Sequence, residues 1–329
     1  MELFRTVVKC TASPDKIGYD TPLLMMGSCF AENMGNRLQQ LKFNIMLNPF
    51  GIVYHPTPAA HQLERIITGK PYTTGELHDH NGLWCSFDHH GRFSHPDISV
   101  CLEQINIGLQ QAHNQLIRAE WLLITFGTAW AYRLKSSGRI VSNCHKFPAS
   151  DFERIRFSID EIYAVWAAAI ARLRKFNPAI KIVFTVSPIR HLCDGAHENQ
   201  LSKSSLLLAV DRLIGEIEHT GYFPAYEIVL DELRDYRFYD EQMTHPNTAA
   251  INYIRKRFCE CYMTENTLQT MKYVDDIVQA AAHRPLHHTS EYRKFAADFL
   301  EKTAKLEQQF PRLDFSKEKE KFETAFSCS

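Results

Sequence analysis

The fold of this chain is decided by one stretch, Pro22-Leu23-Leu24-Met25-Met26-Gly27-Ser28-Cys29-Phe30-Ala31. Its first five residues form a short, continuous apolar run, which is typical of a strand buried on both faces of a parallel sheet. Over residues 29–41 the apolar side chains recur at helical spacing, at Phe30, Met34, Leu38 and Leu41. The stretch therefore predicts a buried strand that turns tightly at Gly27 and runs directly into a helix.

Strands and helices alternate through most of the chain. The same strand pattern returns at residues 121–126, 182–186 and 226–230. Helical periodicity occupies the intervening segments, at about 98–118, 158–176 and 198–219. Buried strands that alternate with helices form a parallel sheet with helices on both faces. We therefore predict a three-layer α/β/α sandwich around a mostly parallel sheet.

Two stretches interrupt this alternation. Residues 75–97 are rich in His, Gly and aromatic residues and are predicted to form a hairpin-like insertion. Residues 131–142 have Ser and Gly between two alternating apolar arms, which predicts a second hairpin. Beyond about residue 262 the sequence becomes charged and helix-forming. We therefore divide the chain into a sandwich domain, 1–262, and a helical extension, 263–329, which either packs on the sheet or forms a partner-binding arm.

The composition argues against several classes of partner. The 329 residues carry a formal net charge of −1, so no electric field favours nucleic acid or an anionic membrane surface. No apolar run approaches the ~18 residues of a membrane-spanning helix, and the first residues lack the pattern of a secretory signal. The nine cysteines include no CxxC pair and are expected to be reduced thiols. We therefore expect a cytoplasmic protein with no nucleic-acid partner and no membrane span.

Ser28 is the candidate nucleophile. In an open parallel sheet, ligands bind beyond the carboxyl ends of the strands, where the next helix offers unpaired backbone N–H groups. A serine at this turn faces the substrate, and its own N–H can stabilise an oxyanion. Two alternatives remain open: Ser28 caps the helix, as serine often does, or Cys29 is the nucleophile rather than a buried thiol.

Six short segments follow one another along the chain: Gly-Ser-Cys-Phe-Ala at 27–31, Asn-Pro-Phe-Gly at 48–51, Asn-Cys-His-Lys at 143–146, Ser-Pro-Ile-Arg-His at 187–191, Glu-Asn-Gln-Leu-Ser-Lys at 198–203 and Met-Thr-His-Pro at 243–246. In this order they resemble the GSCFA family, a bacterial group related to the SGNH (GDSL-like) hydrolases. The resemblance extends from residue 22 to about residue 262. It implies a flavodoxin-like sheet and an SGNH-type active site, with Ser28 as nucleophile and His245 as general base.

The chain departs from the SGNH pattern beside His245. SGNH enzymes commonly have Asp-x-x-His, but Gln242 stands three residues before His245. An amide oxygen can orient the imidazole, yet it cannot stabilise an imidazolium by charge. The acid of a triad would then be Asp240, which we favour, or Glu241. Without either acid, Ser28 and His245 would act as a dyad with a backbone carbonyl as the orienting group.

The oxyanion hole departs from the SGNH pattern as well. The resemblance implies a glycine N–H and an asparagine side chain as donors besides the N–H of Ser28. Gly51 is the expected glycine. The strand at 121–126 is followed by Gly-Thr-Ala-Trp where the pattern would offer Gly-x-Asn-Asp, so no asparagine is present there. Asn143, after the second hairpin, is expected to bring the amide back to the site.

Arg190 and His191 follow the strand at 182–186 and are expected to bind substrate. A guanidinium binds a carboxylate or phosphate with two hydrogen bonds, although an ion pair with Asp194 or Glu198 would explain Arg190 equally well. Lys203 is expected to belong to the same polar shell. The histidines of the 75–97 insertion lack the spacing of a zinc site, so we predict a polar lid, no metal and no cofactor.

Together these residues predict a serine ester hydrolase that acts on a small-molecule ester or acylated substrate without a cofactor. Ser28 would attack the acyl carbonyl and His245 would transfer the proton. The N–H groups of Ser28 and Gly51 and the side chain of Asn143 would hold the oxyanion. The alternative is a catalytically silent module that binds an acylated or glycan ligand, because Gln242 and the absent Gly-x-Asn-Asp weaken the catalytic interpretation.

Overall fold

The computed structural model describes residues 6–283, 287 and 289–327. The chain divides into two compact units. The first comprises the residues up to Thr11, Pro22–Gly35 and Ile45–Phe258, and the second comprises Ala12–Thr21, Asn36–Asn44 and the chain from Cys259 onward. Two short segments near the N-terminus thus belong to the unit that contains the C-terminal helices.

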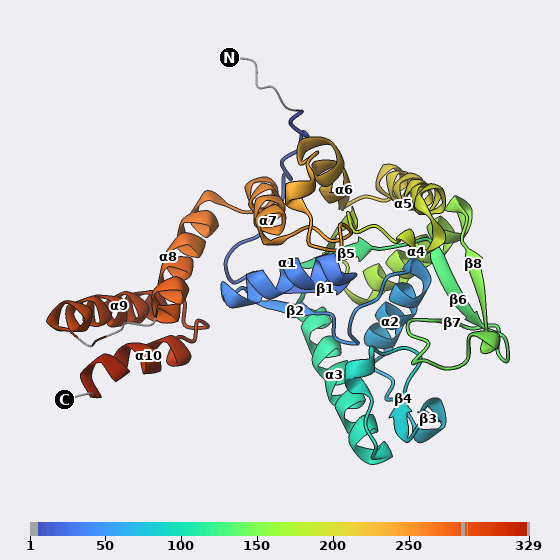
Figure 1. The fold of residues 1–329 in the computed structure, drawn as a ribbon, viewed down its shortest axis with the longest axis horizontal. Helices are drawn as coiled ribbons and strands as arrows, with labels where there is room; N and C mark the ends of the chain where they lie inside the picture. The colour runs from blue at the N-terminus through green and yellow to red at the C-terminus, as the bar shows by residue number, and fades with distance from the viewer. Residues whose placement is uncertain (1–5, 284–286, 288, 328–329) are drawn as a thin grey trace. The chain divides into compact units, whose positions relative to one another are not determined.

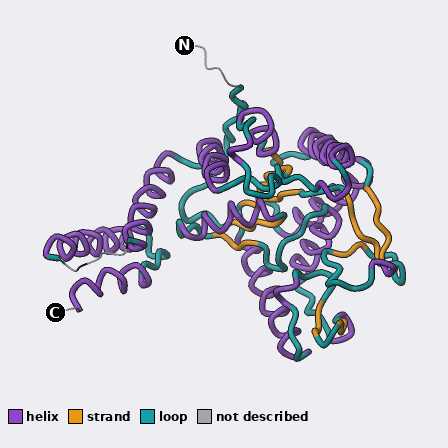
Figure 2. Tube along the Cα trace, viewed as in Figure 1, coloured by secondary structure: helices purple, strands orange, loops and turns teal. Residues whose placement is uncertain are grey.

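The first unit is built on a five-stranded sheet in the order β10-β9-β5-β1-β2, with every neighbouring pair parallel. Its strands β1, β2 and β5 are labelled in Figure 1, and strands are drawn in orange in Figure 2. The strands are β1 (Leu23–Gly27), β2 (Ile45–Leu47), β5 (Trp121–Phe126), β9 (Lys181–Val186) and β10 (Thr220–Tyr222). The predicted strands at 22–26, 121–126 and 182–186 are confirmed. The strand order reverses between β1 and β5, and such a switch point opens a crevice at the carboxyl ends of the strands.

Helices flank the sheet and complete a three-layer α/β/α sandwich, as predicted. They are α1 (Cys29–Gln40), α2 (Pro56–Thr68), α3 (Ile98–Arg118), α4 (Ile159–Phe176), α5 (Ala196–Glu216) and α7 (Thr248–Tyr262). Alternate strand residues such as Leu24, Leu122 and Ile182 point to one face and pack with apolar side chains of α2, α3, α4 and α5. The intervening residues, such as Leu23 and Val183, are also buried. Burial on both faces explains why these strands are continuous apolar runs.

The predicted strand at 226–230 is wrong. Residues Ala225–Glu227 form the short helix α6, and Ile228–Glu232 continue it as a π-helical turn. Tyr226, Ile228 and Val229 are buried, and a short buried apolar run does not distinguish a strand from a buried helix. The fifth strand is instead β10, six residues earlier, whose Thr-Gly-Tyr sequence carries no apolar pattern.

The helix α2 has no counterpart in the sequence prediction, although its start carries clear signals. Pro56 stands at its first position, where a missing N–H costs no hydrogen bond. The ring of His55 caps the helix, since Nδ1 accepts the N–H of Thr57 at 3.0 Å. The helix ends at Gly69, which has the left-handed φ of 59° that favours glycine.

Both interrupting stretches contain antiparallel strands. In the first, β3 (His78–His80) pairs with β4 (Leu83–Cys85) across Asn81-Gly82, whose φ values of 55° and 75° fit a two-residue hairpin turn. In the second, β6 (Trp130–Leu134) pairs with β7 (Ile140–Val141). A third strand, β8 (Phe152–Arg156), pairs with the other edge of β6 and was not predicted.

The second unit is mainly helical. Its helices α8 (Glu265–Ala282), α9 (Ser290–Gln309) and α10 (Ser316–Ser327) pack against one another around Leu306, Phe315 and Phe322. Asn36–Asn44 joins them through ion pairs, since Arg37 binds Asp275 at 2.7 Å and Lys42 binds Glu318 at 3.0 Å. The charged C-terminal sequence therefore folds into a small helical core of its own.

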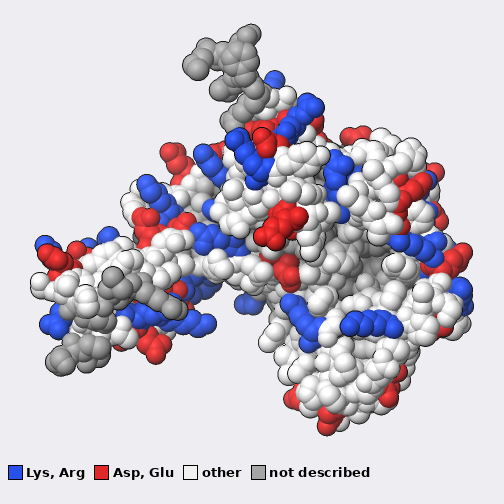
Figure 3. All heavy atoms as spheres, in the orientation of Figure 1, with Lys and Arg blue, Asp and Glu red and all other residues white. Residues whose placement is uncertain are grey.

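Charged side chains of both signs mix on the face of the molecule seen in Figure 3, where neither sign forms a continuous patch. Among the residues that the structure describes, no helix combines the length and apolar character needed to cross a membrane.

Candidate active site

Ser28 lies at the switch point of the sheet, directly after β1. The turn that presents it depends on Gly27, whose φ is +145° and whose hypothetical Cβ would lie 2.4 Å from the carbonyl oxygen of Thr125. Asn48, after β2, fixes this turn because its Oδ1 accepts the N–H of Gly27 at 2.8 Å. The Ser28 side chain is 1% exposed, and its Oγ has no hydrogen-bond partner among the described residues. Buried hydroxyls usually have a hydrogen-bond partner, so the unbonded Oγ is an unusual feature of this turn.

A cavity of about 720 Å³ opens beside Ser28. One part of its lining comes from the loops after the strands of the sheet and includes Ser28, Tyr54, Thr128, Arg190 and His191. Another part comes from the β6-β7-β8 sheet and its loops and includes Trp130, Tyr132, Asn143, Phe147 and Phe152. His245 completes the lining. The fold therefore brings Ser28, His245, Asn143, Arg190 and His191 to one cavity, whereas Gly51 and Asp240 lie outside the lining.

His245 projects from a tight loop before α7. Its Nδ1 lies 3.0 Å from Oγ1 of Thr244 and 3.5 Å from Oδ2 of Asp240. Glu241 and Gln242 are exposed, and neither makes a hydrogen bond or ion pair with the ring within the described residues. Of the three residues considered for the acid, Asp240 is the one that approaches the imidazole.

Ser28 and His245 share the cavity without a hydrogen bond between them, because Ser28 Oγ has no partner in the described part of the chain. Cys29 also lines the cavity, and its Sγ lies 3.0 Å from the hydroxyl of Tyr54. Catalytic hydrogen bonds are often long before substrate binds. The serine hydroxyl is therefore free to bond a ligand, while the neighbouring thiol is engaged.

The two predicted oxyanion donors besides Ser28 differ in availability. The N–H of Gly51 donates to the carbonyl of Asn48 at 2.8 Å, so a turn already uses it. Asn143 lines the cavity, and its Oδ1 accepts the N–H of His145 at 2.9 Å, which leaves its amide nitrogen for a ligand. Asn48, which the sequence analysis gave no role, is buried with an unpartnered Nδ2.

Arg190 has neither of the ion pairs considered from the sequence. Asp194 pairs with the guanidinium of Arg154, and Glu198 pairs with Arg156 at 3.2 Å. The guanidinium of Arg190 makes no ion pair or hydrogen bond with any residue that the structure describes; its backbone N–H donates to the Thr244 carbonyl at 3.2 Å. That backbone bond ties the loop after β9 to the loop that carries His245.

The first turns of α5 hold the loops after β5 and β9 in place. Asn199 Oδ1 accepts the N–H of His191 at 2.9 Å, and Ser202 Oγ accepts the N–H of Ala129 at 2.8 Å. The ammonium of Lys203, which is 0% exposed, donates to the carbonyls of Gly127 at 2.6 Å and Ser187 at 2.7 Å. Within the six-residue segment 198–203, Asn199, Ser202 and Lys203 therefore hold together loops that line the cavity. We call these three side chains the clamp. The sequence singled out the motif but not this role, because the contacts join distant segments.

Burial and neighbouring cations change the charge states in this region. Burial, followed by the charge of Lys203, lowers the pKa of His191 to about 4, so its ring is neutral near pH 7. Its Nε2 is buried without a partner, and its ring lies edge-on to Tyr54 at 5.7 Å. Burial, followed by the charge of Arg190, lowers the pKa of Lys203 to about 7.

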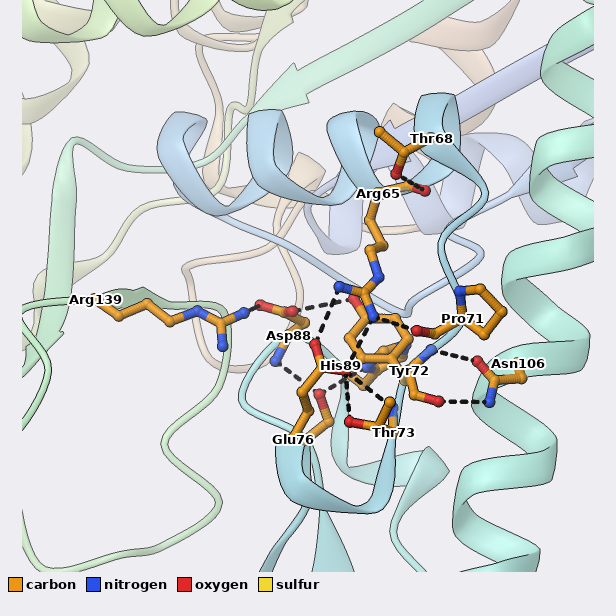
Figure 4. Close-up of polar contacts among 11 residues, drawn as sticks. Arg65, Thr68, Pro71, Tyr72, Thr73, Glu76, Asp88, His89, Asn106 and Arg139 are labelled. Carbon is orange, nitrogen blue, oxygen red and sulfur yellow. Dashed lines mark hydrogen bonds and ion pairs between the residues drawn. The ribbon is translucent and has the colours of Figure 1, made fainter.

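A polar network joins the histidine-rich insertion to α2 and to the residue before β7 (Figure 4). Asp88 accepts a hydrogen bond from the Tyr72 hydroxyl at 3.0 Å and pairs with Arg139, beside β7. Gln62, on α2, donates to the Asp88 carbonyl at 2.7 Å and to Ser142 Oγ at 3.1 Å. His90 of the insertion lines the cavity. Within the described residues, no three His, Cys, Asp or Glu side chains gather as a metal site would require.

Two family models match the sequence of this chain. The sequence model of the GSCFA family matches residues 22–258, and that of the GSCFA domain protein C-terminal domain matches residues 274–326. No curated protein has significant sequence similarity to the chain.

Two solved structures are similar to the chain at a distance. One is a carbohydrate esterase family 3 protein from Talaromyces cellulolyticus, with a TM-score of 0.36, 7% identity, and coverage of 77% of this chain and 98% of its own. The other is the acetyl xylan esterase Est2A from the rumen bacterium Butyrivibrio proteoclasticus, with a TM-score of 0.36, 11% identity, and coverage of 74% of this chain and 63% of its own.

Proposed function

Since the chain belongs to the GSCFA family, we propose that it is a serine ester hydrolase with Ser28 as nucleophile and His245 as general base. One observation carries the proposal: a buried, unpartnered serine hydroxyl and a carboxylate-contacted histidine line the same cavity at the switch point of a parallel sheet. A nucleophile, a base and a group that orients the base are the parts that acyl transfer through serine needs.

The reaction divides into acylation and deacylation. Ser28 Oγ attacks the ester carbonyl as its proton passes to His245, and the carbonyl oxygen becomes an oxyanion. Collapse of this tetrahedral intermediate breaks the bond to the alcohol, which leaves with the proton from His245. Water, deprotonated by His245, then attacks the acyl-serine, and the acid is released as Ser28 regains its proton. Asp240 stabilises the imidazolium that forms in each half.

The oxyanion would be held by the N–H of Ser28 and the amide nitrogen of Asn143. Asn143 lines the cavity, and its amide oxygen already accepts the N–H of His145, so the amide nitrogen is the atom left for a ligand. The N–H of Gly51 would join them if its hydrogen bond to the Asn48 carbonyl opens when substrate binds. Arg190 and His191 would contact the rest of the substrate.

A specific observation favours a second candidate, a silent module that binds an acylated or glycan ligand in the same cavity. The engaged N–H of Gly51 and the missing Ser28–His245 hydrogen bond are what such a module would also have. A fluorophosphonate probe separates the two, because it labels a serine only where a base and an oxyanion site activate it.

The test of the proposal is therefore labelling of the purified chain with a fluorophosphonate, followed by turnover of para-nitrophenyl esters of increasing acyl length. We expect labelling of one residue, Ser28, by peptide mass spectrometry, and turnover that declines once the acyl group outgrows the cavity. Absence of both labelling and turnover, with saturable ligand binding retained, would establish the silent module instead.

We also propose that the enzyme works in the cytoplasm. The eight cysteines that the structure describes are all free thiols, which a reducing compartment favours. Cell fractionation with an antibody against the native protein tests this location, and recovery from an exported fraction would contradict it.

A further inference from the structure

The lining of the cavity beside Ser28 includes two arginines, Arg154 and Arg190, and within the described residues no Asp or Glu is among the side chains that form it. Arg154 is neutralised by Asp194. Arg190 is half-buried and has no acidic partner among the described residues. A partly buried charge without a partner is costly, so its retention indicates that a ligand supplies the opposite charge.

A second basic side chain, Lys203, lies beside the cavity. Its amine is fully buried and donates to the carbonyls of Gly127 and Ser187, with no carboxylate at hydrogen-bond distance among the described residues. Ser187 is part of the cavity lining, so this amine lies next to the cavity. Burial, followed by the charge of Arg190, lowers the pKa of Lys203, so an anion bound in the cavity would favour its protonated form.

A hydrogen-bond donor of the cavity also lacks an acceptor. The indole Nε1 of Trp130, which can only donate, is buried without a partner among the described residues. Trp130 and Arg190 both line the cavity. A ligand that satisfies them must offer several acceptor atoms, and oxyanions such as carboxylates do so while also carrying the missing charge.

We infer that the substrate is an anionic ester, with a carboxylate or similar oxyanion separate from the scissile bond, and that Arg190 is its specificity-determining residue. This inference rests on the proposed hydrolase function. The guanidinium binds the anion with two parallel hydrogen bonds, while the aromatic walls formed by Trp130, Tyr132, Phe147 and Phe152 contact the apolar part of the substrate.

The experiment compares pairs of esters that differ only in charge. Para-acetoxybenzoate and para-acetoxybenzamide place the carboxylate or its neutral counterpart on the alcohol side. Para-nitrophenyl hemiadipate and para-nitrophenyl hexanoate do the same on the acyl side, with a chain too long for the carboxylate to attack its own ester readily. Each kcat/KM is divided by the uncatalysed rate, so that intrinsic reactivity is removed. We expect at least one pair to favour the anion by ten-fold or more, and the preferred pair identifies the side that carries it.

Variants then assign the preference to one residue. Arg190→Gln is expected to lower kcat/KM for the anionic ester at least ten-fold more than for its neutral partner, mainly through KM, and Arg190→Lys to retain part of the preference. Arg133→Gln is the matched control, because it removes the same charge from a half-buried arginine of β6 that pairs with Glu153 and is not part of the cavity lining. This control is expected to leave the preference unchanged.

Binding separates failure of this inference from failure of the hydrolase proposal. In Ser28→Ala protein, ligand-observed NMR should detect para-acetoxybenzoate more strongly than para-acetoxybenzamide, and Arg190→Gln should abolish the difference. Such binding without wild-type turnover would reject the hydrolase and retain the anion site. Turnover of neutral esters as fast as anionic ones, or an anion preference that survives Arg190→Gln, would overturn the inference and leave the hydrolase intact.

Discussion

Oδ2 of Asp240 lies 3.5 Å from Nδ1 of His245, although five positions separate the two residues along the chain. The loop between them closes on itself, since the N–H of Asp240 donates to the His245 carbonyl at 2.8 Å and the N–H of His245 donates to Asp240 Oδ1 at 3.3 Å. Met243, with a φ of 58°, allows the tight reversal. A closed loop of this kind presents a carboxylate to the imidazole at a spacing other than the Asp-x-x-His of SGNH enzymes.

This contact predicts that Asp240→Asn lowers kcat by at least ~10²-fold, towards the ~10⁴-fold loss that follows when a triad acid becomes an amide. The loss arises because an amide cannot stabilise the imidazolium. Gln242→Ala is the control, since Gln242 is exposed, and it should change kcat much less. Steady-state kinetics on the best ester measures both. If Asp240→Asn and Glu241→Gln each leave kcat unchanged, no side-chain acid operates, and Ser28 and His245 act as a dyad.

Replacing the nucleophile should separate chemistry from folding. Ser28→Ala is expected to abolish fluorophosphonate labelling and ester turnover. Its thermal unfolding midpoint should hardly change, because the hydroxyl it removes makes no hydrogen bond in the described structure. Cys29→Ala is the neighbouring control and should retain labelling. If turnover persists in Ser28→Ala, or vanishes in Cys29→Ala, the nucleophile is the thiol of Cys29 and not Ser28.

Gly51 is expected to be needed for two reasons: a larger residue would collide with His90, and its N–H is a candidate oxyanion donor. A side chain at φ +87° is strained, and the added Cβ of Gly51→Ala would lie 2.2 Å from Cβ of His90, which lines the cavity. We predict a loss of ~1–3 kcal/mol in unfolding free energy from the backbone strain, together with a higher KM as His90 is displaced. Urea unfolding and ester kinetics measure the two effects. An unchanged stability with a lowered kcat would instead indicate a direct role of the N–H.

Lys203 should be a major determinant of stability. Lys203→Met keeps the length of the side chain but leaves the buried carbonyls of Gly127 and Ser187 without their donor. Each unsatisfied buried carbonyl costs ~1–3 kcal/mol, so the two together cost ~2–6 kcal/mol; removal of the buried charge offsets part of this, and we predict a net loss of ~2–4 kcal/mol. Lys135→Met, at an exposed position, is the control. A Lys203→Met protein as stable as wild type in urea would contradict the clamp.

Acid should destabilise the protein through its buried histidines. Burial lowers the pKa of His89 to about 3, from an ordinary value of 6.5. Above pH 6.5 the ring is neutral in both states and contributes no pH dependence. As the pH falls from 6.5 towards 3 the unfolded chain binds a proton that the folded chain does not, so unfolding free energy falls by ~1.4 kcal/mol per pH unit.

His89→Phe should make this decline shallower. The substitution removes the titrating ring and keeps an aromatic ring stacked on Phe50, whose centroid lies 4.5 Å from that of His89. Urea unfolding at a series of pH values compares the slopes of the two proteins. Equal slopes below pH 6.5 would show that His89 is already protonated in the folded state.

The sequence by itself determined the three central strands of the sheet and the strand-to-helix turn that carries Ser28. The runs at 22–26, 121–126 and 182–186 are buried on both faces, so their apolar character is continuous and readable without neighbours. The turn at Gly27 is equally local, because a strand followed at once by a helix leaves one conformation for the residue between them. The apolar run at 226–230 led to a wrong strand prediction, because a short buried run fits a buried helix as well as a strand.

Only the tertiary structure decided which polar residues act together. The distance between Asp240 and His245 follows from a loop closed by hydrogen bonds. Arg190 lacks an ion pair with Asp194 because Asp194 pairs with Arg154, 40 residues earlier in the chain. Lys203 likewise binds carbonyls at the ends of β5 and β9 that lie 76 and 16 residues before it. Electrostatic partners depend on distances between segments that are remote in sequence, and residue spacing along one chain does not encode those distances.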